Sequence, residues 1–242
     1  MLVLALDSST RSGSIALSRD SHVLASRIGD AAIRQAVRLP GDLVALLSAH
    51  GHALADVDLF AAAAGPGGFT GLRVGLATIQ GLAMALDRRV FVASTLDLLA
   101  LAGQAAAPRA HWIGAWMHGM RGEVFTALYR PSPTGTGVVA VVPAFVGTPD
   151  EAADTWVSAA PDDAVTVLGD AWVDASDALV TRFGDALQPI EAPPLAEVLA
   201  IEAARRATEA VVPAAVRPAY VRRPDAVLTR LQAGLPVTGD IG

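Results

Sequence analysis

The sequence contains no cysteine, no lysine and no asparagine among its 242 residues. Without cysteine there can be no disulfide framework, no thiolate metal ligand and no cysteine nucleophile. Without lysine there is no Walker-type phosphate loop, no Schiff base and no lysine general base, and without asparagine there is no N-glycosylation acceptor. All 18 basic residues are therefore arginines, and several classes of catalytic chemistry are excluded at the outset.

Long apolar runs are also missing. The longest, at residues 1–6, 59–64 and 138–142, are too short to span a bilayer, and no basic region precedes the first. The net charge of −6 argues against this chain gripping a nucleic-acid backbone by itself. Because 52% of the residues are hydrophobic and 17% are charged, we expect a folded cytoplasmic protein that does not bind membranes.

The first half of the chain reads as three strands followed by alternating helices and strands. Strand-like runs at 1–6, 14–17 and 21–28 are separated by turn residues and predict a meander. A helix, a strand, a helix, a strand and a helix follow at 33–50, 59–64, 70–86, 90–92 and 95–107. This order is that of a ribonuclease H-like unit, in which helices cover the faces of a mixed sheet.

The same pattern begins again after Pro108. Strands are expected at 112–116, 124–129 and 138–142, followed by a helix at 150–158, a strand at 164–168 and helices at 171–183 and 195–211. We therefore predict an α/β protein of two similar lobes, residues 1–107 and 108–211. The arginine-rich segment 212–231 is expected to pack back on the first lobe, and residues 232–242 to form a flexible tail.

Two turns have the composition of an anion-binding site. The run GPGGFTG at 65–71 joins a buried strand to a helix, where backbone N–H groups and the helix dipole could hold an anion. The run Asp7, Ser8, Ser9 and Thr10 places a carboxylate before a hydroxyl-rich turn, as a phosphate-binding hairpin with a magnesium-ordering carboxylate would need. Both runs are equally suited to ordinary tight turns, with Thr70 as a helix cap.

The helix expected at 70–86 is unusual because Arg73 is its only charged residue after Thr70. A helix that is apolar all round must be covered on nearly every side. One stripe of this helix is smooth (Gly71, Gly75, Thr78 and Ala85) and invites close approach by another helix, while bulky residues lie beside it (Leu72, Leu76, Ile79 and Leu86). The covering helix belongs either to this chain or to a partner protein, and the pattern fits both.

The five histidines do not predict a metal site. None forms an H-x-x-x-H pair on a helix, and His50 and His52 follow a helix where both are expected to be solvated. The sequence also has no G-x-S-x-G nucleophile elbow.

Several motifs together resemble the bacterial TsaB (YeaZ) family of tRNA threonylcarbamoyladenosine biosynthesis. They are LALDSST at 4–10, AGPGGFTGLRVG at 64–75 and GLA at 81–83, followed in the same order by STLD at 94–97, RGEVF at 121–125 and RPAYVR at 217–222. The resemblance implies two ribonuclease H-like lobes of the actin-like ATPase (ASKHA) superfamily.

The resemblance also implies a role as the non-catalytic partner of the related enzyme TsaD, with an ATPase, TsaE, joining the complex. TsaD transfers a threonylcarbamoyl group to the adenosine beside the anticodon of tRNAs that read ANN codons. It further implies that tRNA is reached only through the complex, and that a homodimer is an alternative state when TsaD is absent. No cofactor is expected to bind tightly, and ATP or ADP with Mg²⁺ would enter only at the level of the complex.

We accordingly expect no catalytic and no metal-binding residues. The first lobe is expected to bind TsaD through its smooth helix and the helix before it, using Gly71, Leu72, Gly75, Thr78, Ile79, Leu82, Leu43 and Leu47. Any nucleotide contact is expected at Asp7, Ser8, Ser9 and Thr10.

Two positions depart from the family pattern. His118, Gly119 and Met120 stand where the family usually has Asp-Ala-Arg, which removes a carboxylate from the cleft between the lobes, and Arg34 stands nearest the place of a family histidine. The main alternative function is an ATP-dependent small-molecule kinase of the same fold. Such an enzyme needs a carboxylate base and two phosphate loops facing one cleft, so the residue at 118 counts against it. A peptidase of this fold would lack metal ligands and a credible nucleophile.

Overall fold

The computed structural model describes residues 1–135, 137–160 and 163–221. The first half of the chain forms β1 (Leu2–Asp7), β2 (Ser14–Arg19), β3 (His22–Ile28), α1 (Gln35–Ala49), β4 (Leu59–Gly65), α2 (Phe69–Ala85), β5 (Arg89–Ser94) and α3 (Thr95–Ala106). The second half forms β6 (Trp112–His118), β7 (Val124–Pro131), β8 (Val138–Gly147), α4 (Pro149–Ala159), β9 (Val165–Leu168), α5 (Trp172–Ala175), α6 (Asp177–Phe183), β10 (Leu187–Pro189) and α7 (Leu195–Arg205). Short 3-10 turns include η3 (Ala207–Glu209) and η4 (Pro213–Ala215).

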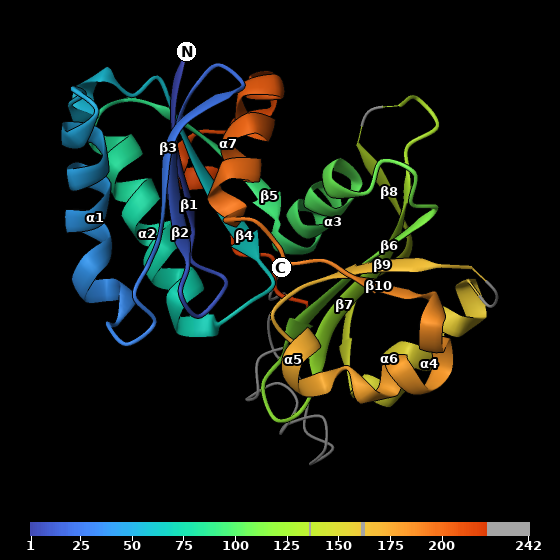
Figure 1. Cartoon of the computed structure of the whole chain (residues 1–242). Helices are drawn as coiled ribbons and strands as arrows, with labels where there is room; N and C mark the ends of the chain where they lie inside the picture. Colours follow the sequence, from blue (N-terminus) through green and yellow to red (C-terminus); the bar gives the residue numbers. More distant parts are fainter. Residues whose placement is uncertain (136, 161–162, 222–242) are drawn as a thin grey trace, which may run out of the picture.

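Two five-stranded mixed sheets form the framework (Figure 1), in the orders β3-β2-β1-β4-β5 and β10-β9-β6-β7-β8. In the first sheet β1 pairs antiparallel with β2 and parallel with β4. In the second, β6 pairs antiparallel with β7 and parallel with β9. The two sheets thus have the same topology, and the predicted duplicated α/β fold is confirmed.

Three details of the second half differ from the sequence-based expectation. The helix expected at 171–183 is divided into α5 and α6 at Ser176. The helix expected at 195–211 ends at Arg205, because the chain then turns through η3 so that Val211 can pair with Val90 of β5. The short strand β10 was not expected, since its three residues end in a proline and lead into the proline-containing run 189–194.

The helices and sheets alternate in layers (Figure 1). Helices α1 and α2 cover the outer face of the first sheet around Phe60, and α4, α5 and α6 cover the outer face of the second around Trp116 and Trp156. Between the two sheets, α3 and α7 share a third core with residues such as Val3 and Ile113. This central core joins the two lobes by apolar packing.

The helices of the central layer do not follow the expected lobe boundary. Helix α7 lies within residues 108–211, the range expected to form the second lobe, but it packs on β1, β2 and β4 of the first sheet. The Ala196 N–H donates to Ser14 Oγ of β2 at 3.0 Å. Helix α3, at the end of the expected first lobe, contacts β6, β8 and β9 as well as β4 and β5. The apolar faces of both helices are completed only by the lobe across the core, which a linear division of the sequence does not reveal.

The segment after α7 returns to the first lobe. The Gln80 side chain of α2 donates to the carbonyls of Pro213 and Val216 at 2.9 and 3.3 Å, and the Ala219 N–H donates to the Ala64 carbonyl at 2.7 Å. We call residues 213–221 the C-terminal strap. Residues 222–231, also expected to pack back, and the tail 232–242 lie outside the described residues. Within the described part of the chain, no helix combines the length and the apolar character needed to cross a membrane.

Candidate functional site

A cavity of about 670 Å³ lies between the lobes, where the β1–β2 turn faces α5 and the segment before α7. Three carboxylates line it, those of Asp7, Asp170 and Glu191, and its walls are largely apolar, with Trp172, Val173, Ile190 and several prolines. Among the described residues that line this cavity, none is basic. The cavity is therefore acidic and apolar at once.

Asp7 ends β1 at the floor of this cavity and is 1% exposed. Its carboxylate accepts hydrogen bonds from the Ser9 N–H at 2.9 Å, from the Ser9 hydroxyl, and from the Thr10 hydroxyl at 3.1 Å. Burial raises the pKa of the Asp7 carboxyl, the nearby Asp170 raises it further, and the hydrogen bonds from Ser9 and Thr10 oppose the rise. The hydroxyls of Ser9 and Thr10, two of the three expected to contact a phosphate, are thus already engaged by Asp7.

The structure separates the four residues expected to bind a nucleotide. Asp7 and Thr10 line the cavity, whereas Ser8 and Ser9 are buried and do not. The Ser9 carbonyl accepts a hydrogen bond from the Gly68 N–H at 2.8 Å, and a Cβ on Gly67 would lie only 2.4 Å from that carbonyl oxygen. Gly67 and Gly71 of the 65–71 run are therefore needed for close packing on the β1–β2 turn, since a Cβ on Gly71 would lie 2.8 Å from the Ser8 carbonyl oxygen. Because no described residue that lines the cavity is basic, the phosphates of a nucleoside triphosphate would need a divalent cation between them and these carboxylates.

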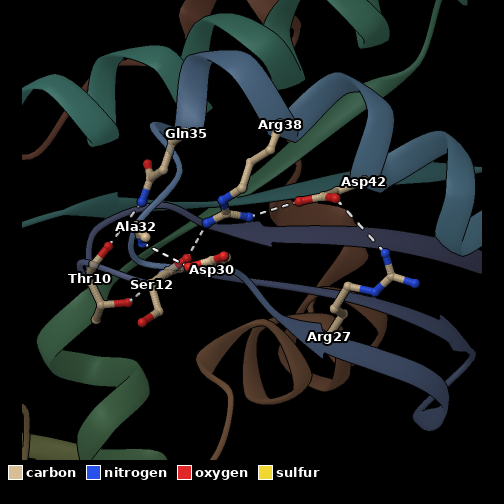
Figure 2. Close-up of polar contacts among 9 residues, drawn as sticks. Thr10, Ser12, Arg27, Asp30, Ala32, Gln35, Arg38 and Asp42 are labelled. Atoms are coloured by element: carbon tan, nitrogen blue, oxygen red, sulfur yellow. Dashed lines mark hydrogen bonds and ion pairs between the residues drawn. The ribbon is translucent and has the colours of Figure 1, made fainter.

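Helix α1 holds the β1–β2 turn through a polar cluster that the sequence analysis missed (Figure 2). Gln35 Nε2 donates to the Thr10 carbonyl at 3.0 Å, and the Arg38 guanidinium donates to the Ser12 carbonyl and, at 2.9 Å, to Asp42. Asp42 lies 3.9 Å from Arg27 of β3. The i,i+4 spacing of Arg38 and Asp42 was the available signal, but it does not say that the arginine also reaches a carbonyl of the turn.

Most residues expected at a partner interface are instead inside the first lobe. Leu43, Leu47, Leu72 and Ile79 are all at most 2% exposed within the core under α1 and α2. A Cβ on Gly75 would lie 1.9 Å from Ser8 Oγ, and a Cβ on Gly71 would lie 2.6 Å from Gln35 Oε1. In this structure these residues are covered from within the chain, because β1, its turn and α1 fill the smooth side of α2. Thr78 and Leu82 are half-buried, and the Thr78 hydroxyl donates to the Val74 carbonyl at 2.8 Å.

A different surface of the same two helices is open. Helices α1 and α2 pack side by side over the first sheet (Figure 1). Together they present an outer helix face, which we define as Val37 and Val44 of α1 with Ala77, Gly81 and Met84 of α2; all five are exposed, Val37 and Met84 by about two thirds. A Cβ on Gly81 would have no neighbour within 4 Å. The residues expected at a partner interface lie on the same two helices, but most of them lie on the buried sides.

The two positions that depart from the family pattern have polar surroundings. The backbone N–H of His118 donates to the Asp170 carboxylate at 2.9 Å, and the ring Nε2 of His118 lies 3.2 Å from Asp174 Oδ2. Arg34 precedes α1 and does not cap the helix with its side chain. Within the described residues, no three or more His, Asp or Glu side chains are grouped as metal ligands.

The sequence is similar to known proteins. Residues 30–141 match the family model described as "TsaD: tRNA N6-adenosine threonylcarbamoyltransferase". The chain is 32% identical over 133 residues to the tRNA threonylcarbamoyladenosine biosynthesis protein TsaB of Bacillus subtilis, a match that covers 54% of this chain and 56% of the relative. The aligned part therefore spans about half the length of that curated relative.

Solved structures extend the similarity to nearly the whole chain. A Pseudomonas aeruginosa protein, described as similar to peptidase YeaZ, superposes with a TM-score of 0.73 and 29% identity, covering 91% of this chain and 99% of that chain. Component A of the Acidaminococcus fermentans (R)-2-hydroxyglutaryl-CoA dehydratase superposes with a TM-score of 0.53 at 11% identity, over 86% of this chain and 100% of that one, and shows the shared actin-like fold alone. With the motifs at Asp7 and in the 65–71 run, these matches show that the chain is similar to TsaB (YeaZ) proteins in sequence over about half of its length and in fold over nearly all of it.

Proposed function

We propose that this chain is a cytoplasmic accessory subunit of tRNA threonylcarbamoyladenosine formation, which binds TsaD through its outer helix face and carries out no chemistry itself. The observation that carries the proposal is this exposed apolar face on the helices α1 and α2. In this proposal TsaE joins the complex, and tRNA is bound by the assembly and not by this acidic chain alone.

The choice of TsaD as partner follows from shape and from sequence similarity. Burying a large apolar side chain such as Val44 or Met84 contributes about 1.5–3 kcal/mol, and the small residues Ala77 and Gly81 allow another helix to approach closely. The TsaD family model matches a range that includes both α1 and α2. A partner of that family would present an equivalent helix pair, so two similar faces can pack around a pseudo-two-fold axis.

The interlobe cavity supports an accessory role. A kinase of this fold would need to hold and neutralise transferring phosphates. Here the lining of the cavity contributes the carboxylates of Asp7, Asp170 and Glu191. The hydroxyls of Ser9 and Thr10 donate hydrogen bonds to the Asp7 carboxylate.

The docking face is tested with a matched pair of valines. Val44 on the outer helix face is 46% exposed, and Val139 on β8 of the second lobe is 50% exposed. We expect Val44→Arg to weaken binding to the TsaD of the same organism by at least about 100-fold in calorimetry, because an unpaired charge would be buried. Val139→Arg should bind as the unchanged chain does, and both variants should keep its unfolding midpoint. Unchanged binding by Val44→Arg would refute the face.

The accessory role is tested by reconstitution. We expect tRNA modification by TsaD, TsaE and a threonylcarbamoyl-adenylate synthase to depend on this chain. An Asp7→Ala variant that still binds TsaD should support the reaction fully. Modification that proceeds equally fast without the chain would refute the proposal. Loss of activity in an Asp7→Ala variant that still binds TsaD would show that this chain takes part in the chemistry.

A further inference from the structure

Arg73 is the only charged residue of α2, and its side chain is exposed beside the outer helix face. It stands four residues before Ala77, eight before Gly81 and eleven before Met84, so all four lie on one side of the helix. We propose that Arg73 recognises a carboxylate on the docking surface of the partner protein, and that the C-terminal strap holds it ready to do so. This inference rests on the proposed function and concerns the same face.

The Arg73 guanidinium contacts two neighbouring aromatic rings. Its central carbon lies 3.8 Å from the ring centroid of Phe69 and 5.6 Å from that of Tyr220. Its Nε donates a hydrogen bond to the Tyr220 hydroxyl at 2.8 Å. An arginine held in this way has already lost much of its rotamer freedom, so an ion pair formed on binding would cost less conformational entropy.

The outer edge of this guanidinium has no acidic partner among the described residues. Arg38, Arg182 and Arg206 all form ion pairs with carboxylates of this chain, whereas no ion pair links Arg73 to any described carboxylate. The two terminal nitrogens form a planar fork that matches the geometry of an oxyanion. The position of this fork, which no described carboxylate pairs, beside exposed apolar residues points to an external oxyanion as its partner.

The surroundings favour a protein carboxylate over an RNA phosphate. Binding to an RNA backbone depends on several basic contacts, and α2 offers Arg73 alone in a chain of net charge −6. Ala77, Gly81 and Met84 instead continue the same side of the helix as an apolar surface. A partner helix carrying one acidic residue opposite Arg73 satisfies both parts of this surface.

The C-terminal strap has a positioning role in this arrangement. The Ala219 N–H donates to the Ala64 carbonyl at 2.7 Å, which ties the strap to the end of β4. Tyr220 is the next residue, and its ring lies 6.0 Å from that of Phe69. Loss of the Tyr220 hydroxyl should therefore weaken recognition by loosening Arg73, without removing the charge.

The test measures affinity for TsaD by calorimetry at 50 and 300 mM salt. Arg73→Met should lower the affinity about 30- to 1,000-fold and flatten its salt dependence, because a charge pair is lost. Arg73→Lys, which keeps the charge but not the fork, and Tyr220→Phe should each lose about tenfold. Arg109→Met removes an exposed arginine in the loop before β6 and should leave both affinity and salt dependence unchanged.

Each outcome tests a different part of the proposed interface. If Val44→Arg abolishes binding but Arg73→Met binds as the unchanged chain does, the carboxylate inference is wrong and the docking face stands. If neither variant weakens binding, the docking face itself is wrong. If Arg73→Met leaves TsaD affinity intact but reduces tRNA binding by this chain, the ligand is a phosphate and the inference is overturned. Unfolding midpoints of the variants must match that of the unchanged chain for a loss to count as support.

Discussion

The clearest physical test of α2 compares the same substitution on its two sides. Gly75 faces β1, and a Cβ there would lie 1.9 Å from Ser8 Oγ and 2.6 Å from Ser8 Cβ. Gly81 faces outward, and a Cβ there would have no neighbour within 4 Å. Replacing either glycine by alanine gives the same helix-propensity gain of about 0.8–1.0 kcal/mol, so the difference between the variants isolates the packing term.

The packing term decides whether Gly75→Ala raises or lowers the free energy of unfolding. A rotation of Ser8 moves its Oγ but not its Cβ, so α2 and the β1–β2 turn must separate by several tenths of an ångström. Overpacking of this kind costs about 1–3 kcal/mol. We therefore expect Gly75→Ala to lower the free energy of unfolding by up to about 2 kcal/mol and Gly81→Ala to raise it by about 0.5–1 kcal/mol.

Urea unfolding followed by circular dichroism measures both variants against the unchanged chain. A Ser8→Gly substitution removes both clashing atoms, so the Gly75→Ala, Ser8→Gly double variant should recover about 1–2 kcal/mol relative to the sum of its single changes. If Gly75→Ala is as stable as Gly81→Ala, the close approach of α2 to β1 is incorrect. The glycine stripe would then be available to a partner after all.

Two further predictions concern the β1–β2 turn. Burial raises the pKa of Asp7 in the folded state above its ordinary value of 3.8, so folding favours the protonated carboxyl and Asp7 lowers stability as the pH rises through that folded-state pKa. The stability of Asp7→Asn relative to the unchanged chain should accordingly increase between pH 4 and pH 7 in urea unfolding, and a flat difference would contradict the raised pKa. Arg38→Met should lower the free energy of unfolding by about 2 kcal/mol, because it removes charged hydrogen bonds to Ser12 and Asp42. A loss below about 0.5 kcal/mol is within the range of an ordinary surface change, and it would show that the turn does not depend on α1.

The order of elements could be predicted because each local pattern agreed with its place in the fold. The run before Asp7 and the alanine-rich run before Gly65 are continuous apolar strands, and both are fully buried as β1 and β4. The helical stripe with Leu43 and Leu47 was expected at a partner interface, and it lies instead in the core of the first lobe. The spacing of apolar residues predicts which side chains share one side of an element, but it does not predict which neighbour covers that side.

The partners of the central helices could not be predicted in the same way. The apolar face of α7 contains Leu195 and Leu199. Their helical spacing is compatible with packing on either sheet, so it does not predict which one the helix covers. Long-range pairs such as Ser14 with Ala196 fix the choice, and they are 182 residues apart. The contact between Arg73 and Tyr220 was not predicted for the same reason, since Tyr220 lies 147 residues further along the chain.

Other elements of the same chain cover most, but not all, of the nearly uncharged helix α2. Its inner side packs on β4, one flank contacts α1 and the other contacts η4 of the C-terminal strap. These contacts account for the glycines and leucines of its buried sides, but not for its outer side. Ala77, Gly81 and Met84 are exposed there, and charged residues at these positions would cost this lobe nothing in packing. An outer side with Arg73 as its only charge is therefore not required by the fold of the monomer. A partner surface that is apolar along most of its length and acidic at one point accounts for both the missing charges and the one that is present.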